Sequence, residues 1–150
     1  MIKWSWYSFN ELTLCTLFDV LELRQKVFVV EQNCAYPDID CLDRDAMHLC
    51  GVDEQGKLIA YLRFLPAIEE GEANILGRVV TRRSVRGEGI GRQLFKIGID
   101  FAQSKKPKTA IKISAQTYLQ KFYASFGFKV SSTPYDEDGI EHIDMIFEKA

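Results

Sequence analysis

The chain has 150 residues, of which 47% are hydrophobic and 27% are charged, and its formal net charge is −2. This length predicts one domain, residues 1–150, with one continuous core. The near-neutral charge gives no sign of nucleic-acid or membrane binding, and no apolar run approaches the roughly 20 residues that span a bilayer. No signal peptide is visible at the start of the chain, so we expect a cytoplasmic protein.

The cysteine and histidine content argues against a metal site. None of the four cysteines forms a Cys-x-x-Cys pair, and there are only two histidines, so no zinc site is predicted. In a reducing compartment the four thiols are expected to be free. Cys34 could act as a nucleophile, but no histidine follows it before His48, and this role is disfavoured.

The N-terminal half is predicted to begin with a strand and a helix. Residues 2–9 alternate and are rich in aromatic side chains, which indicates a strand. Asn10 can cap a helix that runs to about residue 30 and could divide in two near 29–32. The predicted apolar face of this helix consists of Leu14, Leu17, Leu21 and Phe28.

A loop and three strands follow this helix. Residues 33–45 contain a proline and several aspartates and are predicted to form a loop. Residues 48–52 and 58–65 form a predicted hairpin around the turn 53–56, and residues 73–81 form the next strand.

The C-terminal half starts with a helix that opens near Ile90 and ends before Pro107. One apolar stripe supports it, formed by Ile90, Leu94, Ile97 and Phe101. A strand follows at 109–115, then a short helix capped by Thr117 and ended by Gly127, then strands at 128–133 and 140–147. The order β-α-β-β-β-α-β-α-β-β predicts an α/β (α+β) fold, a sheet with helices on its faces.

The sharpest local feature is the run Arg86-Gly87-Glu88-Gly89-Ile90-Gly91, between a predicted strand and a predicted helix. The start of a helix presents unpaired N–H groups and a partial positive charge. Glycines remove the side chains that would hold a ligand away from those groups. Such a turn can bind a pyrophosphate, although a glycine cluster taken alone could be only a flexible connection.

The spacing of the glycines separates the known phosphate-binding motifs. No Lys-Ser/Thr follows Gly91, which excludes a Walker A loop. Arg92 stands where the dinucleotide fingerprint requires its third glycine, which excludes that motif. The pattern Arg-x-x-Gly-x-Gly, formed by Arg86, Gly89 and Gly91, resembles the acetyl-CoA signature of the GNAT superfamily of N-acetyltransferases.

Further segments extend this resemblance along the chain. Residues 75–81 look like the central strand of the superfamily, and residues 122–128 look like its tyrosine-containing helix ending in Gly-Phe. Within the superfamily the chain is similar to the ElaA-like subgroup. That narrower similarity is carried by residues 24–32, 37–40, 114–116, 119–123 and 138–143.

The resemblance implies a mixed, mostly antiparallel central sheet flanked by helices, with acetyl-CoA as co-substrate and no metal. The residues then expected to bind the cofactor are Val79, Val80, Thr81, Arg86, Gly87, Glu88, Gly89, Ile90, Gly91 and Arg92. Main-chain groups of Val79 and Thr81 would contact the pantetheine arm and stabilise the oxyanion.

Charge is distributed unevenly along the chain. Between residues 78 and 96 the only acid is Glu88, and the basic residues are Arg78, Arg82, Arg83, Arg86, Arg92 and Lys96. Arg82, Arg83 and Arg86 are predicted to contact the phosphates of CoA, whereas the side chains of Arg92 and Lys96 are better explained as solvated surface.

The opposite sign prevails from residue 31 to 54, where Arg44 is the only basic residue, and acids recur in the last hairpin. In the family these two regions flank the acceptor side, so an acidic cleft could attract an ammonium group. A solvated surface is the better interpretation for most of these acids.

Three catalytic residues follow from the resemblance and from ordinary acidities. Tyr123 occupies the general-acid position of the family and would protonate the CoA thiolate; as an alternative, it is a core aromatic. An amine with a pKa near 10 must lose a proton before it attacks. Glu31 is the first candidate base and His142 the second, with a water chain or a purely structural His142 as alternatives.

We therefore expect an acyltransferase that acetylates a primary amine of a small molecule or a peptide. A homodimer is plausible, and no nucleic-acid or membrane partner is predicted. Two other functions are kept open: a CoA-binding module without turnover, and an acyltransferase that uses longer acyl thioesters, as acyl-homoserine lactone synthases do.

Overall fold

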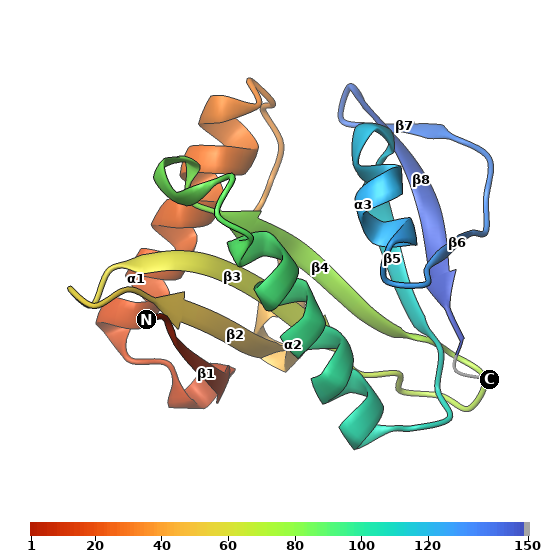
Figure 1. Ribbon diagram of the computed structural model, residues 1–150, viewed down its shortest axis with the longest axis horizontal. Helices are drawn as coiled ribbons and strands as arrows, with labels where there is room; N and C mark the ends of the chain where they lie inside the picture. The colour runs from red at the N-terminus through yellow and green to blue at the C-terminus, as the bar shows by residue number, and fades with distance from the viewer. Residues whose placement is uncertain (149–150) are drawn as a thin grey trace.

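The computed structural model describes residues 1–148 and contains one eight-stranded sheet (Figure 1). The last two residues of the predicted domain 1–150 lie outside the described part. The strands run in the order β1-β2-β3-β4-β5-β8-β6, with β7 paired to β8. Their bounds are β1 (Lys3–Ser8), β2 (Met47–Val52), β3 (Leu58–Leu65), β4 (Asn74–Thr81), β5 (Ile111–Gln116), β6 (Lys129–Val130), β7 (Tyr135–Glu137) and β8 (Ile140–Phe147).

Helices cover both faces of this sheet. They are α1 (Leu14–Arg24), the π-helix η2 (Gln25–Glu31), α2 (Ile90–Lys105) and α3 (Gln120–Ala124), with short 3-10 turns η1 (Phe9–Glu11), η3 (Cys41–Asp45), η4 (Arg83–Val85) and η5 (Thr117–Leu119). Adjacent side chains of β3 point to opposite faces. Tyr61 therefore packs with Val20 and Leu23 of α1, while Leu62 packs with Leu94 of α2.

The observed fold confirms the predicted mixed, mostly antiparallel sheet flanked by helices. Only β4 and β5 pair in parallel, and the other neighbouring strands are antiparallel. The predicted stripe of α2 is also confirmed, because Leu94 is buried and the other three members, Ile90, Ile97 and Phe101, pack against the same core. None of the helices described in residues 1–148 is long and apolar enough to cross a membrane.

The start of the first helix differs from the prediction. Asn10 lies in η1, and the helix is capped instead by Thr13, whose hydroxyl accepts the Thr16 N–H at 3.1 Å. The predicted apolar face was also wrong, because Leu14 is 86% exposed. The regular helix α1 buries Val20 and Leu23 instead, and the π-helix that continues it beyond Arg24 buries Val27.

The C-terminal strands are shorter than predicted. Residues 128–133 contain only the two-residue strand β6, and a separate strand β7 pairs with the start of β8. Thr117 begins the turn η5 and does not cap α3. Gly127, with a φ of 99°, follows the end of α3 as predicted.

Two irregularities of β4 shape the centre of the molecule. β4 pairs with β5 only at Asn74–Ile111 and Ile75–Lys112, so the two strands diverge beyond these residues (Figure 1). On its other edge β4 carries a bulge opposite Leu62, where the register with β3 shifts. Arg78 lies in this bulge with a φ of 51°, which is unusual for a residue other than glycine.

Candidate active site

The glycine-rich turn has the geometry of an anion site at the start of a 16-residue helix. Gly87 and Gly89 have φ values of 88° and 79°, and no atom lies within 4 Å of the position that a Cβ would take. The N–H groups of residues 87–92 have no hydrogen-bond acceptor within residues 1–148. These unpaired donors at a helix N-terminus fit a pyrophosphate.

The end of β4 and the helix α3 lie next to this turn. A Cβ on Gly91 would lie 3.9 Å from Thr81 Cγ2 and 4.0 Å from Phe122 Cζ. Arg92 reinforces the contact, because its guanidinium donates to Ser125 Oγ at 3.1 Å and stands 4.6 Å from the centroid of Phe126. The Arg92 side chain thus holds α3 against α2, which leaves only the main chain of Arg92 free for a ligand.

Arg86 connects the turn to the N-terminal helices. Its Nη1 lies 2.5 Å from Glu31 Oε2, and its Nη2 donates to the Thr81 carbonyl at 3.1 Å. The first candidate base and a predicted phosphate-binding side chain therefore form an ion pair in this structure. Both side chains are partly exposed, at 39% and 26%, so a phosphate can reach Arg86.

Tyr123 is buried in α3 and packs edge-on against Phe95 at a centroid distance of 5.0 Å. Burial, and in second place the neighbouring Tyr118, raises the pKa of Tyr123 to about 12. The hydroxyl therefore stays protonated at neutral pH, as a proton donor must. Its aromatic ring also belongs to the core, so the two interpretations of Tyr123 are compatible.

We call the space where β4 and β5 separate the opening between these strands. His142 lies at the start of β8, opposite Gln116 of β5. Its Nδ1 lies 2.8 Å from the Ile140 carbonyl oxygen and its Nε2 3.5 Å from Glu137 Oε2. A carbonyl oxygen only accepts, so Nδ1 carries the hydrogen and Nε2 is left to take up a proton. No hydrogen bond within residues 1–148 joins His142 to Tyr123 or Glu31.

Two contacts connect the N-terminal segment to this C-terminal hairpin. Gln116 Nε2 donates to Gln32 Oε1 at 3.2 Å, and the Cys34 thiol donates to the Asp138 carbonyl at 3.2 Å. The segment that follows η2 is therefore hydrogen-bonded to β5 and to the hairpin β7–β8. Glu31, next to Gln32, is positioned near the space where the strands separate.

One predicted phosphate contact, Arg82, and one predicted cofactor-binding residue, Val80, are restricted by their positions in the fold. Arg82 is buried, donating to the Leu58 carbonyl at 2.9 Å and to Glu22 at 3.1 Å, so its side chain is engaged inside the fold. Val80 points its side chain into the core beneath α1, which leaves only its main chain for a ligand. Arg83 is exposed and remains a candidate for a phosphate contact.

Most of the acids in 31–54 and in the last hairpin are exposed, as predicted, but three acids after η2 depart from that interpretation. Asp38 and Asp43 are buried, and Asp40 is partly buried. They form ion pairs with arginines of α1, β3 and β4. The contacts are Arg24–Asp38 at 2.9 Å, Arg24–Asp43 at 2.8 Å, Arg63–Asp40 at 2.7 Å, Arg63–Asp43 at 2.9 Å and Arg78–Asp38 at 2.9 Å. We call these six residues the ion-pair cluster.

Electrostatics within this cluster lower the pKa values of Asp40 and Asp43. Burial alone would raise the pKa of Asp43, but the hydrogen bond and charge of Arg24, followed by those of Arg63, hold it below its ordinary value. One sequence signal could have revealed the cluster. Arg63 interrupts the apolar run Leu58–Leu65, and an arginine in a buried strand requires a carboxylate partner.

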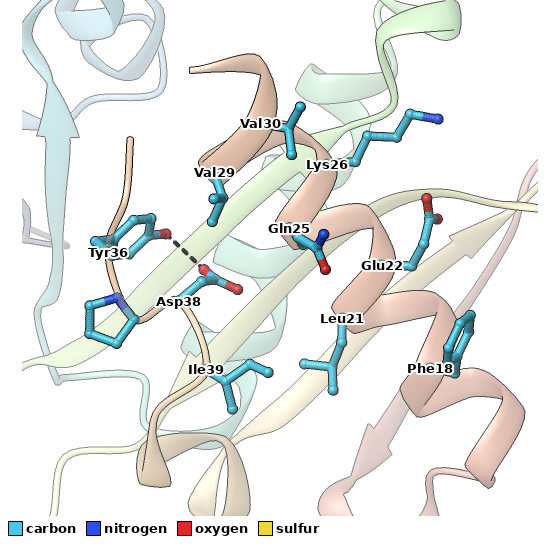
Figure 2. Close-up of a pocket in the computed structure, with 11 residues that line it drawn as sticks. Phe18, Leu21, Glu22, Gln25, Lys26, Val29, Val30, Tyr36, Asp38 and Ile39 are labelled. Atoms are coloured by element: carbon cyan, nitrogen blue, oxygen red, sulfur yellow. Dashed lines mark hydrogen bonds between the residues drawn. The ribbon is translucent and has the colours of Figure 1, made fainter. Parts of the chain in front are cut away.

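A groove of about 760 Å³ lies between residues 36–39 and the helices α1 and η2, and Figure 2 shows the side chains that line it. Its walls are mostly apolar, with Phe18, Val29 and Ile39 among them, and Asp38 of the ion-pair cluster also lines it. None of the predicted catalytic or cofactor-binding residues lines this groove. Residues 1–148 contain no group of three or more His, Cys, Asp or Glu side chains that could hold a metal ion.

Known proteins resemble this chain in sequence and in structure. Residues 23–149 match the family model described as an acetyltransferase (GNAT) domain. Protein ElaA of Escherichia coli is 40% identical over 150 residues, which cover 99% of this chain and 97% of ElaA. The ElaA crystal structure superposes with a TM-score of 0.92, at 39% identity, over 99% of this chain and 100% of that chain.

Two further structures bear on the fold. An acyl-CoA N-acyltransferase from Pseudomonas aeruginosa has a TM-score of 0.90 and 37% identity, covering 97% of this chain and 99% of its own. A CoA-dependent acyl-homoserine lactone synthase, BjaI, has a TM-score of 0.79 at 15% identity, over 99% of this chain and 83% of that chain. At that identity the likeness to BjaI concerns the fold alone.

Proposed function

Since this chain belongs to the GNAT acetyltransferase family and is an acyltransferase, we propose that it transfers the acetyl group of acetyl-CoA directly to a primary amine. One observation carries the proposal. The main-chain N–H groups of residues 87–92 are unpaired at the N-terminus of α2, at the end of a strand whose β5-facing edge is free beyond Ile75.

These residues fit coenzyme A in two ways. The N–H groups from Gly87 to Arg92 would hold its pyrophosphate, with the Arg83 and Arg86 side chains beside it. The free edge of β4 would pair with the amides of the pantetheine arm, because an unpaired strand edge offers both donors and acceptors. Bound acetyl-CoA supplies the activated acyl group, and the protein supplies its orientation.

The acyl transfer then requires that the amine nitrogen lose a proton and that the leaving sulfur be stabilised or protonated. The amine nitrogen bonds to the thioester carbon, the C–S bond breaks, and the sulfur leaves as thiolate. Tyr123 can donate a hydrogen bond to that sulfur. With a pKa of about 12, Tyr123 is a weaker acid than a thiol of pKa about 8.5, so we assign most of its effect to this hydrogen bond.

Removal of the proton from the attacking amine is assigned to Glu31 or His142. Glu31 can act only after Arg86 releases it, which the phosphates of CoA would bring about by competing for the same guanidinium. His142 offers Nε2, and Glu137 at 3.5 Å would pair with the imidazolium that forms. The acceptor is then an amine that reaches the opening between β4 and β5.

Calorimetry and a thiol assay test this proposal. We expect heat of association with acetyl-CoA at micromolar to millimolar concentration, and release of CoA thiol when polyamines, amino acids, aminoglycosides or peptide N-termini are added. The same assays with longer acyl thioesters show which acyl donor the protein uses. A folded protein that binds no acetyl-CoA would contradict the proposal, and binding without thiol release across the panel would favour the CoA-binding module.

A further inference from the structure

The bulge of β4 and the ion-pair cluster meet at one residue. Arg78 adopts a φ of 51° in the bulge, and its guanidinium points into the cluster. Its Nε lies 2.9 Å from Asp38 Oδ1, and its Nη2 donates to the Asp38 carbonyl at 3.0 Å and to Asp40 Oδ2 at 3.3 Å. An arginine in this backbone conformation is disfavoured on its own, so the partners of its side chain must maintain it.

The partners of Arg78 are themselves fixed from two other elements. Arg24, at the end of α1, donates to the Asp38 carboxylate at 2.9 Å and to the Asp38 carbonyl at 2.8 Å. Arg63 of β3 holds Asp40 through two hydrogen bonds of 2.7 and 3.0 Å. Tyr36 adds a hydrogen bond of 2.7 Å to Asp38 Oδ1 (Figure 2).

The position of the bulge has a chemical consequence. A bulge inserts one residue into a strand, so it changes which of the following residues direct their main-chain groups toward each edge. Val79 follows Arg78 directly, on the strand whose β5-facing edge is unpaired. The bulge therefore determines which N–H of β4 faces the space where a thioester carbonyl would lie.

Stability is a poor explanation for this arrangement. Replacing a buried ion-pair network by apolar residues is often neutral or stabilising. Two buried polar atoms of the cluster, Asp43 Oδ2 and Arg63 Nε, also remain without a hydrogen bond within residues 1–148. Arg78 Nε lies within ion-pair distance of Asp38 but is not aligned for a hydrogen bond. A network that is incompletely satisfied and yet buried is better explained by the single backbone geometry that it imposes.

We propose that Arg78 is a positioning residue: its ion pairs with Asp38 and Asp40 fix the β4 bulge so that a main-chain N–H beside Val79 polarises the thioester carbonyl. This inference rests on the proposed function, because it assumes an acyl-CoA in the opening between β4 and β5. It assigns the segment that carries Asp38 and Asp40 a role in catalysis that involves no contact with the substrate.

Infrared spectroscopy of bound acetyl-CoA tests this role without an acceptor. With ¹³C-labelled acetyl-CoA, we expect the wild-type protein to lower the stretching frequency of the thioester carbonyl, since a hydrogen bond weakens that C=O bond. In Arg78→Ala the shift should be lost. Affinity for acetyl-CoA should fall about threefold to tenfold, the loss of one hydrogen bond, while affinity for CoA, which has no acetyl carbonyl, stays unchanged.

Three further variants separate positioning from loss of structure. Arg78→Lys retains the charge but cannot reach both aspartates as a fork does, so part of the carbonyl shift should return. Asp40→Asn, at a partly exposed site, should weaken the shift even if Arg78→Ala fails to fold. Arg44→Ala removes a charge from an exposed side chain that forms no ion pair within residues 1–148 and should change nothing.

The outcomes are distinguishable from failure of the proposed function. If wild-type protein binds no acetyl-CoA, the proposed function itself is wrong. If wild-type protein binds and shifts the carbonyl frequency, but Arg78→Ala and Asp40→Asn retain the full shift and lose only melting temperature, then Arg78 is merely structural and the positioning role is refuted.

Discussion

Two regions of this molecule use their polar groups in opposite ways. In the ion-pair cluster, three arginines and three aspartates neutralise one another inside the fold. In the turn 86–92 the main-chain N–H groups have no partner within residues 1–148. Buried, paired charges are thus engaged within the fold, whereas unpaired donors on an exposed turn are available to a ligand.

The largest expected effect comes from breaking the cluster at its centre. Arg24→Ala would leave the buried carboxylates of Asp38 and Asp43 short of a partner, and removal of one member of a buried pair costs about 3–5 kcal/mol. Urea unfolding measures this loss. Arg44→Ala, which removes an exposed arginine of η3, should stay within about 0.5 kcal/mol of wild type. If both variants lose the same free energy of unfolding, the cluster adds nothing to stability.

Tyr123→Phe should have the next largest effect, on turnover and not on stability. Loss of the hydroxyl removes the donor to the leaving sulfur and should lower kcat about 10²-fold, while the ring still packs on Phe95. CoA affinity should not change. The control is Tyr118→Phe at a side chain that is 74% exposed. Unchanged turnover in Tyr123→Phe would remove Tyr123 from the mechanism.

The pH dependence of kcat tests the assignment of Tyr123 as a hydrogen-bond donor. Because burial raises the pKa of Tyr123 from 10.0 to about 12, the hydroxyl keeps its proton over this interval, and activity that depends on it should persist through pH 10. An alkaline loss of activity that begins below pH 10 and disappears in Tyr123→Phe would contradict the raised pKa.

Gly89→Val tests the ligand-binding turn against a matched glycine. Gly89 and Gly56 have φ values of 79° and 80° and equally open surroundings, so valine strains both backbones to a similar extent. Only Gly89→Val should crowd the pyrophosphate, with an expected loss of CoA affinity of about tenfold or more by calorimetry. Equal CoA binding by the two variants would refute the placement of the pyrophosphate.

Glu31→Gln should produce the smallest effect, and its sign is informative. Glu31 competes with phosphate for Arg86, and a partly exposed ion pair contributes at most about 1 kcal/mol. CoA should therefore bind the variant up to about fivefold more tightly. Glu22→Gln, which frees Arg82 instead, should leave CoA affinity unchanged. Weaker CoA binding by Glu31→Gln would show that the carboxylate supports the turn.

The sequence predicts the ligand-binding turn better than it predicts the ion-pair cluster. The turn is local: its glycines, the helix that follows and the apolar stripe of α2 lie within 20 consecutive residues, 86–105. The cluster joins Asp38 to Arg24 and Arg78, which are 14 and 40 positions away. A charged residue in a loop normally faces water, and only the tertiary fold shows otherwise.

Helix boundaries show the same limit. Asn10 and Thr13 are both suitable caps, and the choice between them depends on how the chain leaves β1 through η1. The π-helix after Arg24 rotates the following side chains relative to a regular helix, so Phe28 and Val27 could not be assigned to their faces from a 3.6-residue period. Likewise, a positive φ at an arginine leaves no trace in the sequence.

Asn74 belongs to the short pairing that joins β4 to β5 in the sheet. It is fully buried, its N–H bonds to the Ala110 carbonyl at 2.9 Å, and its side-chain oxygen accepts the Ala67 N–H at 2.9 Å. Together with Ile75 it forms the whole contact register between β4 and β5. The point at which β4 and β5 begin to separate is therefore set where this two-residue pairing ends, on a residue that the interior of the protein holds on all sides.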